Sequence, residues 1–217
     1  MKKTSLETAA MQVMVQIDSA LALALTVVAR HYYKRQAEAT LQSVKRLSES
    51  APPISQLSTV VEALVHAEDH RFHVHHGVDS RSIVRAAITT ALTRRTQGGS
   101  TITQQLVRVV TGDYRRNFYR KFKELCLSSW LDSKVTKDEQ AVAYLHVAYF
   151  GWRMTGIAQA ANRLDIALPC TPLEAAAVVA RLKYPEPRNP STNREKQIRA
   201  RQIHIIQKMN ASREKSS

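Results

Sequence analysis

The positions of glycine and proline constrain this chain of 217 residues more than any other feature of its sequence. All six glycines lie between residues 77 and 156, and the seven prolines form three clusters outside that stretch, at 52–53, 169–172 and 185–190. The segments between them have apolar residues at helical spacing, and no alternating run bounded by hairpin turns is evident. The sequence therefore predicts one all-α domain of about eight to ten helices, with strands at most minor.

Local start and stop signals predict where several of these helices begin and end. A first long helix is expected over roughly residues 5–48, before a break marked by two prolines. Asp79 is placed to cap the start of another helix, and Gly112 is of the residue type that commonly ends one. The run from Thr171 to Glu174 has the threonine, proline and glutamate of a capping box. A further helix is expected over about 115–132.

The apolar stretch at residues 9–29 leaves two structures open for the N-terminus. At about 1.5 Å per residue it is long enough to cross a hydrocarbon layer of about 30 Å. Asp18 lies near its middle, however, and an aspartate at the centre of a membrane costs roughly 2.5–3.5 kcal/mol. The stretch predicts either a membrane-inserted helix or an amphipathic helix, soluble or lying on a membrane. We expect an N-terminal helical segment over residues 1–50 and a second region over residues 51–217.

The chain is strongly basic, with 32 Lys and Arg against 18 Asp and Glu and a net charge of +14. Such a charge predicts a polyanionic partner, which leaves nucleic acid, an anionic membrane surface and phosphate-bearing substrates as candidates. Neither a Walker loop nor a G-x-G-x-x-G motif is present to support nucleotide binding. Between residues 81 and 95, four arginines flank apolar residues in a pattern suited to a lipid headgroup layer. They are Arg81, Arg85, Arg94 and Arg95.

Two adjacent carboxylates, Glu68 and Asp69, end a predicted apolar helix and precede an aromatic residue, several histidines and a glycine. The simplest interpretation is a polar helix end, with the carboxylates paired to Arg71 or Arg85. A catalytic carboxylate is a second interpretation, because such groups carry general acid–base chemistry. A zinc site is a third, built from Glu68 and the histidines between residues 70 and 75, although their order is not that of H-E-x-x-H.

A second polar stretch occupies residues 98–108 and begins with two glycines. On a helix that starts after them, four polar side chains at spacing i, i+3, i+4 and i+7 form one stripe. The stripe suits a polar, anionic ligand such as a sugar phosphate. A helix-turn-helix element that reads DNA with the same face is the alternative. The four residues are Thr101, Gln104, Gln105 and Arg108.

The third stretch, residues 115–124, is basic and contains one acid, Glu124. Arg120 and Glu124 are i, i+4 neighbours, so a surface ion pair of a few tenths of a kcal/mol is the simple interpretation. Nearby cations lower the pKa of a carboxyl and make it a poor general base. Glu124 is therefore better suited to orienting cations, or a metal, around a phosphate.

These stretches, in this order and spacing, resemble the peptidoglycan glycosyltransferases, the family-51 domains of class A penicillin-binding proteins and monofunctional transglycosylases. The first motif, E-D-x-x-F-x-x-H-x-G, matches residues 68–77 without a gap. The second, G-G-S-T-I-T-Q-Q-L-x-K/R, matches 98–108, and the third, R-K-x-x-E, matches 120–124. Weaker matches follow at 144–157 and from 173 to 190, so the resemblance covers about residues 55–210.

The resemblance implies a lysozyme-like helical fold with a larger lobe and a smaller, membrane-facing lobe. It implies polymerisation of lipid II into glycan on an undecaprenyl pyrophosphate carrier, at the outer (periplasmic) face of a bacterial plasma membrane. Its implied partners are lipid II, the growing glycan, the anionic membrane surface and other cell-wall synthesis proteins, with no nucleic acid. No cofactor is required, although a divalent Mg or Mn ion at the pyrophosphate site, near Glu124, is compatible with the family.

The resemblance also implies roles for individual residues. Glu68 matches the general base, and Glu124 matches the second acid, which supports the leaving-group site. The residues implied in substrate binding are Asp69, Phe72, His75, Gly99, Ser100, Thr101, Gln104, Gln105, Arg108, Arg116, Arg120 and Lys121.

The chain departs from the family pattern at three places. Val109 and His146 stand where the family usually has asparagine, and the segment around residues 152–155 lacks an expected glycine and tyrosine. Both acidic positions are intact. A degenerate, non-catalytic relative that binds glycan or lipid is therefore an alternative to the enzyme, as is a basic helical protein that binds DNA through residues 98–124.

Overall fold

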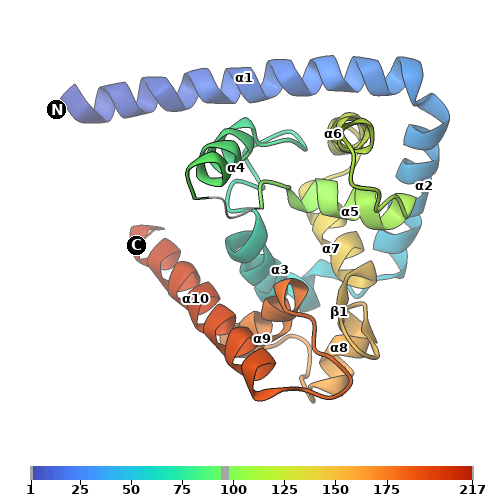
Figure 1. Ribbon diagram of the computed structural model, residues 1–217, viewed down its shortest axis with the longest axis vertical. Coiled ribbons are helices and arrows are strands. Elements are labelled where there is room, and N and C mark those ends of the chain that lie inside the picture. The colour runs from blue at the N-terminus through green and yellow to red at the C-terminus, as the bar shows by residue number, and fades with distance from the viewer. Residues whose placement is uncertain (1, 94–97, 217) are drawn as a thin grey trace. The chain divides into compact units, whose positions relative to one another are not determined.

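The computed structural model of the chain describes residues 2–93 and 98–216, and these residues are almost all in helices or in the short loops that join them (Figure 1). This confirms the predicted all-α class. The two short strands form one antiparallel hairpin. The elements are α1 (Lys2–Tyr32), α2 (Lys34–Ser50), α3 (Ile54–Glu68), α4 (Ser80–Thr93), α5 (Ile102–Thr111), α6 (Phe118–Asp132), α7 (Lys137–Val147), β1 (Tyr149–Gly151), β2 (Met154–Thr155), α8 (Ile157–Arg163), α9 (Pro172–Lys183) and α10 (Thr192–Ser216).

Contacts between residues divide the chain into two compact units, and each unit takes two separate stretches of sequence. Unit 1 comprises Met1–Ser43 and Arg71–Lys137, and unit 2 comprises Val44–His70 and Asp138–Ser217. Unit 1 therefore contains α1, α4, α5 and α6, whereas unit 2 contains α3 and the elements from α7 to α10. The division predicted at residue 50 stays a prediction.

In unit 1, the N-terminal helix α1 packs against α6 and also contacts α4. Leu25 and Ala29 of α1 are buried in one apolar cluster with Val78 and Cys126. Burial of this kind stabilises by about 25 cal/mol for each Å² of apolar surface removed from water. Helix α1 is thus part of the core of unit 1. Within the described residues, no helix combines the length and the apolar character that crossing a membrane requires.

An ionic network fixes α1 to the start of α4. Asp18, only 1% exposed, accepts hydrogen bonds from Arg71 Nη2 at 3.1 Å and from the backbone N–H of Ser80 at 2.9 Å. Arg71 also donates to Asp79. Burial raises the pKa of Asp79, but bonds from Ser82 and Arg71 outweigh it and hold that pKa below its usual value. The expected pairing of Arg71 with Glu68 or Asp69 is wrong, because Arg71 is engaged by Asp18 and Asp79.

The single helix predicted over residues 5–48 is two helices, because the chain bends at Tyr33 between α1 and α2 (Figure 1). The Tyr33 ring packs against the apolar cluster of unit 1 and meets the Tyr119 ring edge to face, with centroids 6.4 Å apart. Burial and the bond with Tyr119 raise the pKa of Tyr33 to about 12. An anchored aromatic ring therefore accompanies the bend, and the local sequence contains no helix breaker that would predict it.

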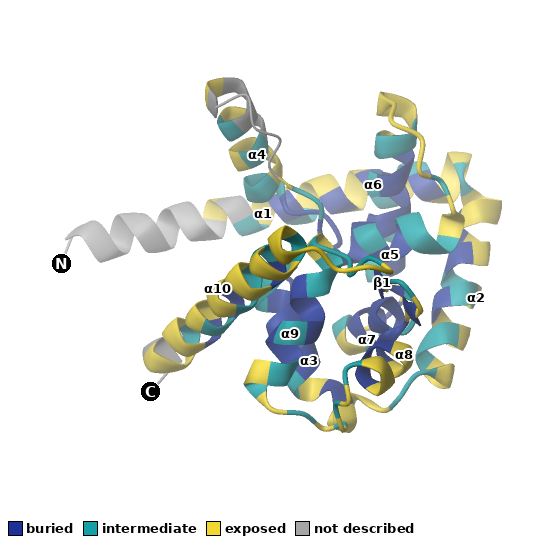
Figure 2. Cartoon of the chain, turned by 60° about the horizontal axis from the view of Figure 1, so that its bottom comes forward, coloured by how far each residue is buried: buried dark blue, intermediate teal, exposed yellow. Residues whose placement is uncertain are grey.

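In unit 2, α3 packs against α9 and α10. The contacting faces of α3 and α9 are fully buried, whereas α10 is buried on one side and exposed on the other (Figure 2). Ala175 and Ala176 of α9 are fully buried, as are Leu57, Val60 and Leu64 of α3, and small side chains such as alanine allow two helices to pack closely.

Two of the predicted caps are confirmed. Thr171 and Glu174 form both bonds of a capping box at the start of α9. Gly112 ends α5 in a left-handed conformation, with φ of 62°. The helix predicted from about 115 begins instead at Phe118, because Asn117 is the N-cap and its side chain accepts a hydrogen bond from the backbone N–H of Arg120.

Candidate active site

Glu124 is the centre of a cluster of cations in unit 1. It lies on α6, its side chain is 3% exposed, and both of its oxygens accept hydrogen bonds. Arg108 donates from Nε at 2.8 Å and from Nη2 at 3.1 Å, which is the bidentate geometry that matches a carboxylate. Lys121 Nζ donates at 2.6 Å, and Arg120 donates as well. Three cations from two helices are therefore held on one buried carboxylate.

The cluster extends to polar groups at the start of α5. Lys121 Nζ also donates to Ser100 Oγ at 3.0 Å and to Gln104 Oε1 at 2.6 Å, and Arg108 Nη2 lies 3.4 Å from Ser100 Oγ. The structure thus brings together six residues that the second and third motifs place up to 24 positions apart. We call this set, Ser100, Gln104, Arg108, Lys121 and Glu124 with Arg120, the cation cluster.

Two local features fix the orientation of α5. Thr101 is its N-cap, since the hydroxyl accepts from the backbone N–H of Gln104 at 3.2 Å and donates to the carbonyl of Gly77 at 2.7 Å. Gly77 has φ of 80°, and a Cβ there would lie 2.4 Å from the carbonyl oxygen of Ser128 on α6. Only glycine fits this position, so the glycine that ends the first motif joins α5 to α6.

The electrostatics of the cluster favour an anion. Burial raises the pKa of Glu124, but the bonds from Arg108 and Lys121 outweigh that effect, so its pKa lies below the usual value. Burial lowers the pKa of Lys121, and its bond to Glu124 opposes the shift. With Glu124 ionised, three cations face one carboxylate and leave an excess of positive charge. A phosphate group is the kind of ligand that arginine and lysine at such a site bind.

The same arrangement does not suit a divalent metal. Calcium and magnesium take several oxygen ligands, commonly carboxylates, whereas both oxygens of Glu124 already face cations. The described residues contain no group of three or more His, Cys, Asp or Glu side chains that could hold a metal ion, and this includes the histidines of the first motif.

A pH titration of stability tests the cluster. Because the pKa of Glu124 in the folded protein is below its ordinary value of 4.5, ionised Glu124 stabilises the fold at neutral pH, and this contribution is lost as the pH falls through the folded pKa. We expect the melting temperature to fall between pH 6 and pH 3, and to fall less in Glu124→Gln. Thermal unfolding followed by circular dichroism measures both. Equal decreases in the two proteins would contradict the assignment.

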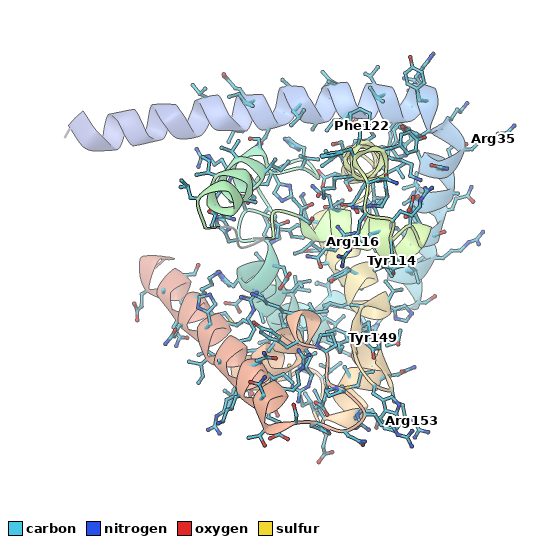
Figure 3. The ribbon with its side chains drawn as sticks, in the orientation of Figure 1. Arg35, Tyr114, Arg116, Phe122, Tyr149 and Arg153 are labelled. Atoms are coloured by element: carbon cyan, nitrogen blue, oxygen red, sulfur yellow. The ribbon has the colours of Figure 1, made fainter. Side chains whose placement is uncertain are left out.

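The remaining predicted residues of unit 1 take different places. Gln104 and Thr101 are 0% and 2% exposed, so the stripe expected to meet a ligand or DNA is largely buried. This argues against α5 as a DNA recognition helix. Gln105 is half-buried. The close approach that Gly99 permits is to α4, since a Cβ there would lie 3.0 Å from the Ser82 carbonyl oxygen. Arg116 is exposed on the loop after α5, near Tyr114 (Figure 3).

Phe72 and His75 lie in the interior of unit 1 and are 0% and 1% exposed. Lys137 Nζ lies 4.7 Å from the centroid of the Phe72 ring and donates to the carbonyl of His75 at 2.8 Å and to Asp132 at 2.6 Å. These two motif residues therefore support the fold around Gly77, and their buried positions give no direct access to a ligand.

Glu68, the predicted general base, is the last residue of α3 in unit 2. Its Oε1 accepts a hydrogen bond from Arg201 Nη2 at 3.1 Å, and the same nitrogen donates to the carbonyl of Ala67 at 2.7 Å. A carboxylate at a helix C-terminus lies at the negative end of the helix dipole, which the guanidinium offsets. Asp69 is the C-cap of α3 and is buried.

Arg201 is a site residue that the sequence did not reveal. It lies on α10, more than 130 positions after Glu68, in a basic segment with several similar arginines. Two further contacts join these helices: Lys208 donates to the carbonyl of His66, and Arg213 pairs with Glu62 at 2.8 Å. Lys and Arg residues at helical spacing in the last segment indicate a basic helix. They do not predict that this helix, α10, packs against α3.

Comparison with known proteins gives a consistent result. The transglycosylase family model matches residues 29–210. A Cupriavidus necator protein named as a transglycosylase is 36% identical over 152 residues, which are 68% of this chain and 64% of that protein. Penicillin-binding protein 1A of Escherichia coli is 33% identical over 82% of this chain, and the match spans 20% of its length. A monofunctional glycosyltransferase of Staphylococcus epidermidis is 34% identical over 56% of this chain and 45% of its own length.

Proposed function

The chain belongs to the transglycosylase family, and we propose that it is a peptidoglycan glycosyltransferase that polymerises lipid II at the outer face of a bacterial plasma membrane. In this reaction a hydroxyl of the acceptor sugar attacks C1 of the donor sugar, and the undecaprenyl pyrophosphate carrier leaves. An α-linked donor that becomes β-1,4-linked is inverted at C1. One displacement is therefore sufficient, and no covalent sugar–enzyme intermediate is needed.

The cation cluster is the observation that carries this proposal. The bond that breaks leaves negative charge on the pyrophosphate, and cations fixed beforehand stabilise that charge without reorganising. Glu124 holds Arg108, Arg120 and Lys121 in place. The distance to Glu124 is 2.8 Å from Arg108 and 2.6 Å from Lys121. Glu124 thus positions the cations, and its lowered pKa makes it a weaker base than an ordinary carboxylate.

Glu68 is proposed as the general base. A sugar hydroxyl is a weak acid, so its proton must be taken as the oxygen attacks, and a positioned carboxylate typically contributes 10²–10⁴-fold in rate. The bond from Arg201 holds Oε1 of Glu68 at 3.1 Å and so orients the carboxylate that is proposed to accept the proton.

Incubation of the protein with labelled lipid II tests the proposal. The expected product is high-mass glycan that lysozyme digests, with release of undecaprenyl pyrophosphate. Lipid II that binds without being polymerised would instead identify a non-catalytic relative, the alternative that Val109 and His146 leave open.

We also propose that α4 meets an anionic membrane, because the lipid carrier stays in the bilayer. Val84, Ile88 and Leu92 of α4 are 51%, 54% and 79% exposed, and Arg81 and Arg85 lie on the same helix. Apolar side chains next to cations suit the headgroup layer. Arg94 and Arg95, which belong to the same predicted pattern, lie outside the described residues.

The membrane proposal predicts that the protein binds anionic liposomes, more weakly as salt is added. Replacing Ile88 and Leu92 together by serine should weaken this binding by about tenfold or more, since it removes apolar groups that would be buried in the membrane. The matched control replaces Leu173 and Ile203 of unit 2, which are 61% and 52% exposed, by serine. Cosedimentation with phosphatidylglycerol vesicles measures both, and an equal loss in the two variants would rule out a specific role for α4.

A further inference from the structure

Three arginines of unit 2 surround the single indole ring of Trp152. Their guanidinium carbons lie over the ring at 4.6 Å from its centroid for Arg153, 4.9 Å for Arg163 and 5.6 Å for Arg188. Each distance is within the range of a cation–π interaction, which has an upper limit of about 6 Å. All three arginines are exposed, so their charges are accessible from solvent. Figure 3 labels Arg153 on the β1–β2 hairpin.

These residues come from three segments, two of which are joined by backbone hydrogen bonds. Trp152 and Arg153 form the turn of the β1–β2 hairpin, Arg163 ends α8, and Arg188 lies in the loop after α9. The N–H of Trp152 donates to the carbonyl of Glu186 at 2.7 Å, and the N–H of Glu186 donates to the carbonyl of Phe150 at 3.1 Å. The loop that carries Arg188 is thus fixed to the hairpin, which defines the spacing of the charges before any ligand binds.

The three cations have no acidic partner among the described residues. No ion pair or hydrogen bond to a carboxylate involves Arg153, Arg163 or Arg188, and the nearby carboxylate of Glu186 is already paired with Arg181 at 2.7 Å. A ring has two faces, so at least two of the three guanidinium groups share one face. Like charges held this close repel one another, and a bound anion would relieve that repulsion.

The backbone of Arg153 has a strained conformation. Its φ is 56°, a left-handed conformation that few residues other than glycine adopt readily. Such strain often marks a functional position. At this turn the chain therefore has an arginine in a conformation that would favour glycine, with its guanidinium group next to Trp152.

We propose that Trp152, Arg153, Arg163 and Arg188 form a binding site for an acidic peptide segment that carries two or more closely spaced carboxylates. A guanidinium stacked on a ring still has its N–H donors in the plane of the group, and these donors match the two oxygens of a carboxylate. The three charges belong to three separate side chains that lie over one ring. Each of them can pair with its own carboxylate, and several carboxylates on one flexible chain would satisfy them together. The proposed polymerisation reaction does not require this site, so the two proposals stand independently.

Binding of a fluorescein-labelled tetraglutamate peptide to the full-length protein, followed by fluorescence anisotropy at low salt, tests the proposal. We expect saturable binding that weakens with added salt, and no binding of the matching tetraglutamine peptide. Arg163→Gln and Arg188→Gln should each weaken binding by about fivefold, the upper range for an exposed ion pair. Trp152→Leu, which keeps all three charges, should also weaken binding, because the ring that orders them is lost.

Arg194→Gln is the matched control. Arg194 is in the same unit and lies over another aromatic ring, that of Tyr184, at 5.8 Å from its centroid. Replacing it by glutamine lowers the net charge by the same amount as Arg163→Gln or Arg188→Gln. If Arg194→Gln weakens binding as much as Arg163→Gln, binding depends only on the net charge of the protein and the proposal is wrong. Failure of tetraglutamate to bind the wild-type protein would also overturn it. So would displacement by inorganic pyrophosphate at equal charge concentration, because that result would identify a phosphate site. Lipid II polymerisation in the same variants reports on the proposed function separately.

Discussion

Glu68→Gln should lower the rate of lipid II polymerisation by at least 100-fold while leaving the fold and the binding of lipid II largely intact. The amide has the size of the carboxylate and can still accept the bond from Arg201, which is 3.1 Å long in the wild-type protein. It cannot take a proton from the attacking hydroxyl, and general-base catalysis typically contributes 10²–10⁴-fold. Single-turnover assays with labelled lipid II measure the rate, and circular dichroism verifies the fold.

Glu62→Gln is the control that the structure offers for this experiment. Glu62 lies on the same helix as Glu68 and pairs with an arginine of the same partner helix, with Arg213 Nη2 at 2.8 Å. The two variants therefore lose the same charge from the same helix pair, and only one of them removes the proposed base. Glu62→Gln should polymerise at close to the wild-type rate. If Glu68→Gln keeps more than about a tenth of that rate, another group is the base.

Arg108→Ala should slow polymerisation by about 100-fold, within the range seen when one fixed donor is removed from a developing negative charge. The side chain makes two bonds to Glu124 and lies beside Ser100, so its charge is fixed within the cation cluster. Arg108→Lys should recover part of the loss, because lysine restores the charge but not the paired geometry. The expected change is in kcat, since the charge it stabilises develops as the pyrophosphate leaves.

Arg116 provides the comparison within the same proposed role. It is exposed on the loop between α5 and α6, and the ion pairs recorded for the described residues do not include it (Figure 3). A solvated charge of this kind mainly attracts an anionic substrate from a distance. Arg116→Ala should therefore slow turnover less than Arg108→Ala, and its effect should diminish as salt is added. Unchanged kinetics in both variants would contradict the proposal that the cation cluster and Arg116 act on the pyrophosphate.

The sequence predicted features that depend on neighbouring residues more accurately than features that depend on distant ones. The capping box at Thr171, the end of α5 at Gly112 and the all-α class follow from short-range signals, and the structure confirms them. The bend at Tyr33 was not predicted, because its ring contacts residues of α6 that are remote in sequence.

The candidate site divides in the same way. The motifs indicated the residues of the cation cluster, but not that Thr101 caps α5 or that Gln104 is buried and accepts a hydrogen bond from Lys121. A polar stripe at helical spacing has the same pattern whether it faces solvent or the partner groups of a buried network. Arg71 lies in the turn after α3 and bonds to α1, and Arg201 of α10 bonds to α3. These partners are distant in sequence, so periodicity and spacing do not predict the bonds.

The contact between Asp18 and Arg71 has a consequence for how the N-terminus can be altered. One inserted residue turns a helix by about 100°, so an insertion between Asp18 and Ala29 would direct the carboxylate away from Arg71. The part of the helix ahead of Asp18 is under no such constraint from this bond. Fusions or exchanges of sequence should therefore be tolerated upstream of Asp18. A chain that begins after Asp18 would lose one of the two ion pairs of Arg71 and keep the pair with Asp79. Arg71 lies three positions after the proposed base, Glu68, so the change would be close to the candidate site.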